Sequence, residues 1–267
     1  MGKLIIIASG KGGTGKTTLT AHVGAALARS GRLTVLVDAD AGFRNLDIAL
    51  GLESSIVYDY SDYINGTSDL DDILIKNSDL ENLYFVAAPQ SVPTSDFDED
   101  KTEEFWNSLK SRFEFVLADA PAGMGDGFMF AAKYADEAII VSLAETSSLR
   151  DADRVISVLE DLGTETIRLV LNRIRPELIE RGIMMNADDC VDVLSIPILG
   201  IIPEDEAVTE SMFKGSPDTE AGEYGAGRAF ENIASRLRGN QVPMMEFGSS
   251  TKKGFLSRVK ALFRKQS

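Results

Sequence analysis

The chain has 267 residues, 44% of them hydrophobic, which is enough to bury one large α/β core or two small ones. Its 42 acidic and 27 basic residues give a net charge of −15, which argues against broad non-specific binding to nucleic acid. One cysteine, Cys190, and one histidine, His22, exclude an intrachain disulfide framework, a CxxC redox pair and a cysteine or histidine metal cluster. We therefore expect a cytoplasmic protein. No apolar run reaches the roughly 20 residues that a membrane-spanning helix needs.

The predicted elements alternate between strand and helix along the chain. Residues 3–9 form a continuous apolar run that ends in a glycine-rich loop, which is typical of a buried parallel strand. Further strands are predicted in LTVLVDAD, LYFVAAP, FEFVLADAP, EAIIVSLAE, IRLVLNRI and IPILGIIP, and helices at about residues 16–30, 102–112, 147–162, 187–194 and 226–237. His22 is expected to pack or to face solvent on the first helix. This alternation predicts an α/β fold with a doubly wound, mostly parallel sheet and helices on both faces.

Polar side chains follow the ends of several predicted strands. Asp38 and Asp40 follow the second strand, Asp119 follows FEFVLA, and Asn172 follows IRLVL. Because ligands of such sheets bind at the carboxyl ends of the strands, we expect these side chains to line one site.

The loop after the first strand carries a phosphate-binding pattern. Gly10, four residues and then Gly15-Lys16-Thr17 match G-x-x-x-x-G-K-[ST]. Glycines let the backbone turn tightly and direct successive N–H groups at an anion, and the N-terminus of the following helix favours negative charge. Lys16 is placed to reach the β- and γ-phosphates, and the Thr17 hydroxyl is a suitable Mg²⁺ ligand. The predicted phosphate contacts are Gly10, Gly12, Gly13, Thr14, Gly15, Lys16 and Thr17.

The loop contains a second lysine, Lys11, which taken alone could be an ordinary surface residue. The full string KGGTGKTT, followed by DADAGFRNLDIALGLE, VYDY, DAPAGM, YADEAIIV and GIIPED, resembles the ParA/MinD family of deviant Walker A ATPases. The resemblance covers about residues 3–265 and is strongest to the branch that determines the site of the division septum. It implies a dimer that closes face to face around two ATP molecules, with Lys11 reaching the partner's nucleotide. Hydrolysis would then depend on dimerisation, and Lys11 and Lys16 would both be catalytic.

The resemblance also implies roles for other residues. Asp40 would orient or activate the attacking water, Asp38 and Asp119 would hold Mg²⁺ together with Thr17, and Asn45 would lie near the dimer interface. From the residues alone, each aspartate could equally be a helix cap or a loop residue. The implied contacts around the adenine are Asn172, Arg173, Pro203, Glu204 and Asp205, and the resemblance adds Lys11 and Thr18 as nucleotide contacts of the loop.

Two stretches depart from the family pattern. An acidic residue is expected close after DAPAG, and here Gly125 precedes Asp126. The stretch GSPDTEAGEYGAG is more polar than the family's usual apolar segment, so we expect local packing to differ there while the chemistry is retained.

The predicted domains are an ATPase domain at residues 1–239, a linker at 240–251 and an amphipathic helix at 252–267. This last segment has six basic residues and no acidic one, whereas the rest of the chain has 21 basic and 42 acidic residues. Its apolar residues recur at helical spacing with basic groups beside them, which is typical of a helix that lies on a membrane surface. A terminal helix docked on the core and a nucleic-acid-binding helix are the alternatives. The predicted membrane contacts are Phe255, Leu256, Arg258, Val259, Lys260, Leu262 and Phe263.

The sequence therefore predicts a Mg²⁺- and ATP-dependent dimerising ATPase that binds the cytoplasmic face of the inner membrane and helps to place the division septum. The resemblance implies a MinC-like division inhibitor and a MinE-like activator as partners, with part of the partner surface at residues 150–153. A ParA-like DNA-partition ATPase is the first alternative, although the acidic body and the tail disfavour it. A membrane adaptor with negligible turnover is the second alternative, and a single cysteine excludes an iron–sulfur reductase.

Overall fold

The computed structural model describes residues 1–90, 92–219 and 225–245. The predicted amphipathic helix, the second half of the predicted linker and part of the polar GSPDTEAGEYGAG stretch lie outside the described residues.

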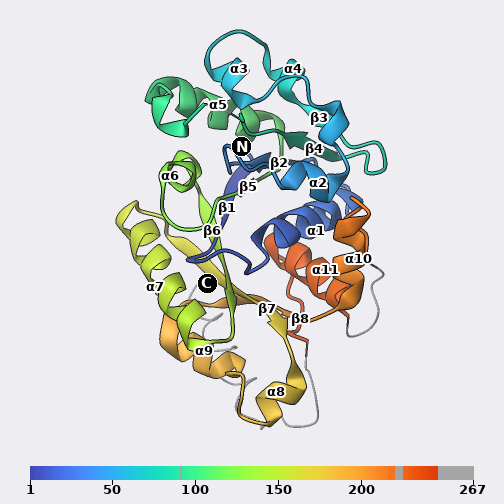
Figure 1. Cartoon of the computed structure of the whole chain (residues 1–267), viewed down its shortest axis with the longest axis vertical. Coiled ribbons are helices and arrows are strands. Elements are labelled where there is room, and N and C mark those ends of the chain that lie inside the picture. Colours follow the sequence, from blue (N-terminus) through green and yellow to red (C-terminus); the bar gives the residue numbers. More distant parts are fainter. Residues whose placement is uncertain (91, 220–224, 246–267) are drawn as a thin grey trace.

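A single eight-stranded sheet organises the described chain, in the order β3-β4-β2-β5-β1-β6-β7-β8 (Figure 1). Every neighbouring pair is parallel except β3 with β4, which is antiparallel. The strands are β1 (Lys3–Ala8), β2 (Thr34–Asp38), β3 (Ile75–Lys76), β4 (Leu83–Val86), β5 (Phe115–Asp119), β6 (Glu137–Leu143), β7 (Thr166–Ile174) and β8 (Ile198–Pro203).

Helices connect the strands and cover both faces of the sheet. The longer ones are α1 (Lys16–Arg29), α5 (Glu99–Arg112), α6 (Asp126–Ala132), α7 (Thr146–Asp161), α9 (Ala187–Leu194), α10 (Glu206–Phe213) and α11 (Ala226–Leu237). The shorter ones are α2 (Leu46–Leu50), α3 (Tyr60–Ile64), α4 (Leu70–Ile73), α8 (Pro176–Glu180) and the 3₁₀ turns Glu53–Ser55 and Thr94–Asp96.

The central strand β1 shows why both faces are covered. Leu4 and Ile6 point into a core that includes residues of α5, α6, α7 and α9, while Ile5 and Ile7 point into a core that includes residues of α1, α2 and α11. Successive side chains of a strand alternate between faces, so a continuously apolar strand requires an apolar layer on each side. The predicted doubly wound, mostly parallel α/β fold is confirmed.

The structure contains helices that the sequence did not predict, namely α2, α3, α4, α6, α8 and α10. Other local details differ as well. The fifth helix begins at Glu99, three residues before the predicted start, because the Asp98 side chain accepts a hydrogen bond from the backbone N–H of Lys101 (3.1 Å) and caps it. Strand β3 was not predicted, since two residues leave no periodic pattern. Met244 and Met245, in the predicted linker, contact the two cores, and the domain borders stay a prediction.

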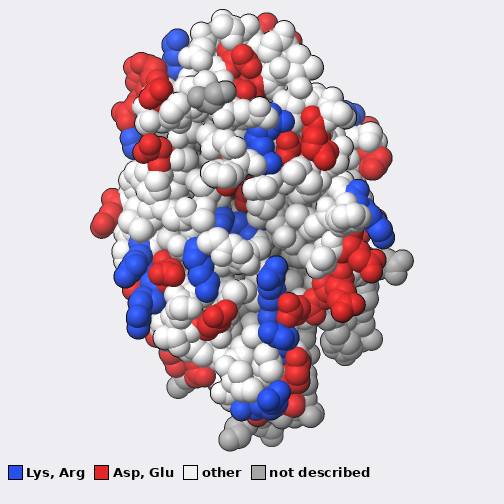
Figure 2. Space-filling view, viewed as in Figure 1, with Lys and Arg blue, Asp and Glu red and all other residues white. Residues whose placement is uncertain are grey.

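Acidic residues outnumber basic ones in the chain, by 42 to 27. On the face seen in Figure 2, carboxylates gather over α5 and over α10, and basic residues are scattered between them. Among the helices of the described ranges, none has the length and apolar character to cross a bilayer.

Candidate active site

The phosphate loop lies between β1 and α1, at the carboxyl edge of the sheet. Gly13 (φ 79°) and Gly15 (φ 94°) adopt the left-handed conformation that favours glycine. A Cβ atom on Gly15 would also lie 2.2 Å from Asn172 Nδ2, and one on Gly10 would lie 2.3 Å from the backbone of Asp151 in α7. The loop is therefore glycine-rich because its backbone turns sharply and is packed closely between β7 and α7.

Lys16 is held inside the loop by hydrogen bonds within its own chain. Its Nζ donates a hydrogen bond to Ser9 Oγ (2.9 Å), and Ser9 Oγ donates to the carbonyl of Lys11 (2.7 Å). Lys16 is only 8% exposed, and this burial lowers its pKa below the ordinary value although Asp119 and Asp40 oppose the shift. The ammonium group is thus fixed where phosphate oxygens would enter, so little ordering entropy remains to be lost on binding.

Two buried carboxylates lie beside the loop. Asp38 and Asp119 are register partners at the ends of the paired strands β2 and β5. Asp119 accepts hydrogen bonds from Thr17 Oγ1 (2.6 Å) and Thr20 Oγ1 (3.1 Å), and Asp38 accepts from the backbone N–H of Asp40 (2.9 Å). Burial raises the pKa of Asp38 to about 7, with repulsion from Asp119 adding to the shift, and burial raises that of Asp119 to about 6.

This donor set fits Mg²⁺. Asp38 and Asp119 are both buried and are neighbours in the strand register, so two negative charges there are costly and a divalent ion beside them would relieve that cost. Within the described ranges there is no group of three or more histidine, cysteine or acidic residues that could enclose a metal. Mg²⁺ needs no such group, because it is usually held by one or two carboxylates, substrate phosphates and waters. Thr17, Asp38 and Asp119 would hold it here.

Asp40 is half-buried two residues beyond the end of β2. Burial raises the pKa of its carboxyl group, and the positive charge of Lys16 acts in the opposite direction. Asp40 therefore lies close enough to Lys16 for their charges to interact, and its role towards an attacking water stays a prediction.

The side chain of Lys11 contacts residues of its own chain in this structure. Its Nζ is 3.4 Å from Ser147 Oγ, in the first turn of α7, and 3.9 Å from Glu145 Oε2, and one third of its side chain is exposed. No second copy is present, so the role of Lys11 across a dimer interface stays a prediction. Asn45, the other predicted interface residue, is exposed, and its backbone N–H donates to Asp38 Oδ2 (3.2 Å).

The predicted adenine contacts come together at the ends of β7 and β8. Asn172 Nδ2 donates to the carbonyl of Thr14 (2.7 Å), which fixes β7 to the phosphate loop. Arg173 is exposed, with φ 54°, and its N–H donates to Asn172 Oδ1 (2.9 Å). Pro203, Glu204 and Asp205 line a cavity of about 400 Å³. That these residues contact the adenine base stays a prediction.

One predicted contact has a clear structural task. The two carboxylate oxygens of Asp205 each accept a hydrogen bond of 3.0 Å, from the backbone N–H groups of Ala207 and Ala226. Asp205 therefore caps α10 and ties it to the start of α11.

Sequence reasoning missed Ser9 and Thr20. Ser9 positions Lys16, and Thr20 donates to both Asp119 and the Lys16 carbonyl. A signal for Thr20 was present, because residues three apart on a helix share a face, so Thr17 and Thr20 both project towards β5. His22 packs as expected: burial lowers its pKa to about 4, and it stacks on Phe230.

Comparison with known proteins places this geometry in a family. The model of the CobQ/CobB/MinD/ParA nucleotide binding domain matches residues 5–217. The chain belongs to the MinD/ParA family. It is 42% identical over 248 residues to the septum site-determining protein MinD of Synechocystis, which covers 92% of this chain and 93% of that protein.

Solved structures of MinD proteins have the same fold. The MinC:MinD cell division protein complex of Aquifex aeolicus matches with a TM-score of 0.85 and 39% identity, covering 92% of this chain and all of that one. MinD of Pyrococcus horikoshii, complexed with Mg-ADP, matches with a TM-score of 0.78 and 32% identity, covering 89% of this chain and 96% of that one. The chain is thus a nucleotide-binding protein of the MinD/ParA family along almost its whole length.

The two buried carboxylates make stability depend on pH. Because Asp38 and Asp119 have higher pKa values folded than the ordinary 3.8, the nucleotide-free folded state binds more protons than the unfolded state between about pH 4 and 7. The free energy of unfolding is therefore expected to fall as pH rises through this window, by up to about 1.4 kcal/mol for each tenfold difference in proton affinity between the two states. Asp38→Asn should flatten the fall, measured by urea denaturation across pH.

Asp126→Asn is the matched control, because Asp126 is an exposed carboxylate at the same edge of the sheet. His22 has the opposite effect, since its lowered pKa removes stability as pH falls below about 6.5, but neither substitution changes it. If both variants give the same slope as the original protein, the charge state assigned to Asp38 is wrong.

Proposed function

We propose that this chain is a Mg²⁺-dependent ATPase that dimerises with ATP, attaches to the inner membrane in that state and helps to place the division septum. The observation that carries the proposal is the convergence of Lys16, Asp40 and Asp119 around a glycine-rich loop. The positions of these groups support hydrolysis of the bond to the terminal phosphate.

The residues of this chain have separate tasks in that reaction. Lys16 binds the β- and γ-phosphates, and backbone N–H groups of residues 10–15 surround them. Asp40 orients the attacking water and accepts its proton as the bond to the terminal phosphate breaks. Mg²⁺, when bound, supplies charge neutralisation on the phosphoryl oxygens. Thr17, Asp38 and Asp119 would hold that ion, and Asn172 keeps the loop against β7.

Lys11 would complete the site from the second copy. A cation that arrives only on dimerisation stabilises charge developing in the transition state without strengthening monomer binding, so turnover becomes dependent on the dimer. The dimer would carry two copies of the tail at 252–267, which lies outside the described residues. Each tail would bind anionic lipid weakly and reversibly, and two together would raise avidity steeply.

The partners follow from relatives. A solved structure pairs a MinD of 39% identity with MinC, which supports a MinC-like division inhibitor as a partner of this chain. A MinE-like activator is proposed with it, and α7, whose first turn meets Lys11, offers a surface from which an activator could act on the site. A DNA-partition role is disfavoured by the net charge of −15.

Asp40→Ala tests the proposal. Removing the group that orients water while leaving the binding residues intact should trap the pre-hydrolysis state. We expect a dimer in gel filtration with Mg-ATP, a monomer with Mg-ADP, and phosphate release lowered about 10²-fold or more, the scale of a lost general base.

Asp126→Ala is the matched control and should keep turnover. A variant Asp40→Ala that stays monomeric with ATP would refute the nucleotide-dependent dimer. Full turnover in the same variant would instead refute the role of Asp40 and leave the dimer standing.

A further inference from the structure

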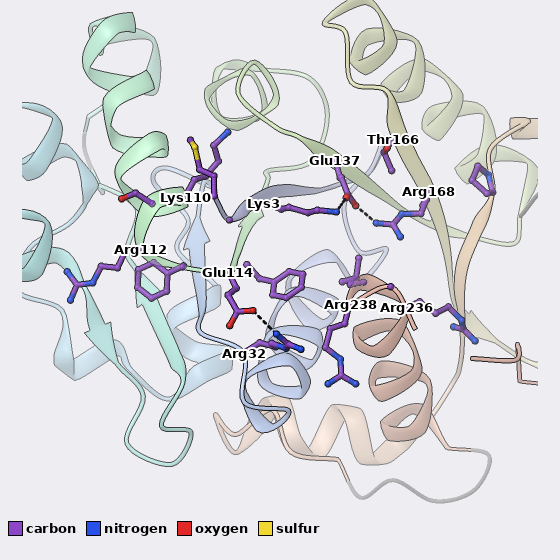
Figure 3. Close-up of a pocket in the computed structure, with 18 residues that line it drawn as sticks. Lys3, Arg32, Lys110, Arg112, Glu114, Glu137, Thr166, Arg168, Arg236 and Arg238 are labelled. Atoms are coloured by element: carbon purple, nitrogen blue, oxygen red, sulfur yellow. Dashed lines mark hydrogen bonds and ion pairs between the residues drawn. The ribbon is translucent and has the colours of Figure 1, made fainter. Parts of the chain in front are cut away.

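A second cavity, of about 730 Å³, lies at the edge of the sheet opposite the phosphate loop (Figure 3). It opens between the amino ends of the parallel strands, since Lys3, Phe115, Glu137 and Thr166 are the first residues of β1, β5, β6 and β7. Its volume is within the range of small-molecule sites, about 300–1,000 Å³. We call it the basic cleft, because its lining includes Lys3, Arg32, Lys110, Arg112, Arg168, Arg236 and Arg238.

The basic cleft has more positive charge than its carboxylates can neutralise. Two carboxylates line it: Glu137 pairs with both Lys3 (2.6 Å) and Arg168, and Glu114 pairs with Arg32 (2.9 Å). Two more reach its rim from outside the lining, where Asp136 pairs with Lys110 and Asp71 with Arg112. Among the described residues, seven cations against four carboxylates leave an excess of three, in a chain whose net charge is −15.

Helix ends account for only part of this excess. The helices α1, α5 and α11 all end beside the basic cleft, and cations near a helix C-terminus interact favourably with its dipole. Each helix end is equivalent to about half a negative charge, so three ends offset about half of the excess of three. A net positive charge therefore remains.

The arginines of the basic cleft differ in how many of their nitrogens donate hydrogen bonds within the protein. Arg236 is committed to the fold, because its three nitrogens donate to the carbonyls of Leu199, Val242 and Pro243. The buried Nε atoms of Arg168 and Arg238, in contrast, have no hydrogen-bond partner among the described residues. In Figure 3, Lys3 and Arg168 converge on Glu137 on one side of the cavity, while Arg32 and Arg238 lie on the other. A ligand between the two sides would face cations from both.

We propose that the basic cleft binds the phosphate group of an anionic ligand. Guanidinium groups match phosphate oxygens in geometry and bind them through paired hydrogen bonds. A phosphate of charge −2 or more would neutralise the positive charge that the carboxylates of the cleft do not balance. The phosphate could belong to a soluble compound or to the headgroup of an anionic lipid. This site is separate from the nucleotide site and does not depend on the proposed ATPase function, because the two lie at opposite edges of the sheet.

The test uses the full chain saturated with Mg-ADP, so that the phosphate loop is occupied. Inorganic pyrophosphate is titrated into it by calorimetry at about 0.15 M salt, where interactions between distant surface charges are largely screened. We expect saturable binding that the double variant Arg32→Gln/Arg238→Gln weakens by about tenfold or more, as expected when charge-assisted hydrogen bonds are lost. If the double variant does not fold, the single variant Arg32→Gln tests the same binding. It changes only an exposed ion pair with Glu114.

The double variant Arg29→Gln/Arg228→Gln is the matched control. It removes the same charge from two arginines outside the basic cleft, which pair with Asp218 and Glu231. A second arm measures sedimentation of the same proteins with phosphatidylglycerol vesicles and with phosphatidylcholine vesicles. If the cleft variant alone loses pyrophosphate binding in calorimetry, the ligand is a soluble phosphate. If the cleft variant alone loses binding to phosphatidylglycerol vesicles, and pyrophosphate binding is unchanged, the ligand is a lipid headgroup. If cleft and control variants behave alike in both arms, the proposal is overturned.

Discussion

Lys11→Ala is expected to lower ATP turnover in the presence of lipid and partner by about 10³-fold, the lower end of the effect of a cationic residue supplied to a phosphoryl-transfer site. The reason is the position of the charge. Lys16 already occupies the loop of its own chain, 2.9 Å from Ser9 Oγ, whereas Lys11 lies at the surface with one third of its side chain exposed. A lysine in that position is accessible to the second copy in the proposed dimer.

The contacts that Lys11 makes within its own chain are weak. Its distance of 3.9 Å from Glu145 Oε2 makes an exposed ion pair, and such pairs contribute about 0–1 kcal/mol. Its hydrogen bond to Ser147 is long, at 3.4 Å. Leaving these contacts costs little, whereas neutralising charge on a phosphoryl group in a closed, water-poor interface is worth several-fold more.

Nucleotide binding by the monomer separates this role from a general loss of the site. With Lys11→Ala, the affinity of the monomer for Mg-ADP should stay within about threefold, because the phosphate contacts of Lys16 and the loop N–H groups remain. Phosphate release, gel filtration with ATP and vesicle sedimentation should all show the loss.

Lys133→Ala is the matched control, since Lys133 is an exposed lysine paired with Glu99 at the surface. It should retain turnover and dimerisation. Unchanged turnover in Lys11→Ala would mean that the positive charge in the transition state comes from within one chain.

The sequence predicted most of this fold because parallel strands buried on both faces are continuously apolar. The runs at β1, β2, β5 and β6 have this pattern, and the rule that their carboxyl ends meet at one edge was sufficient to group Asp38, Asp40 and Asp119 with the phosphate loop. Their actual geometry agrees, with Asp38 opposite Asp119 in the strand register.

What could not be predicted depends on contacts between distant residues. Helix α3 exists largely because Asp59 and Asp62 form a capping box, which gives no apolar periodicity over five residues. Thr20 acquires its role only because Asp119, 99 residues away, lies 3.1 Å from its hydroxyl. The basic cleft is the strongest case. Its cations come from several strands and helices, and each alone resembles an ordinary surface residue or a helix-end cation.

A substitution in the predicted amphipathic helix at 252–267 is expected to have the other large effect, on membrane binding. Phe263→Asp is expected to lower binding of the ATP-bound protein to anionic vesicles by about 10²-fold or more. Burying one phenylalanine side chain contributes about 1.5–3 kcal/mol, and a dimer loses this contribution twice. The added carboxylate is also repelled by anionic lipid, at about 1 kcal/mol per charge near the surface. Residue 263 lies outside the described residues, so this prediction depends on the sequence pattern alone.

Phe213→Asp is the matched control, because Phe213 at the end of α10 is also an exposed phenylalanine, with 93% of its surface accessible. It should leave vesicle binding within about twofold, since it belongs to no apolar stripe flanked by basic residues. In Phe263→Asp, dimerisation with ATP should persist while lipid no longer raises turnover, because the nucleotide site is untouched. Equal loss of vesicle binding in both variants would mean that exposed apolar groups in general hold the protein on lipid. Retention of binding in Phe263→Asp would mean that the tail does not enter the membrane through this face.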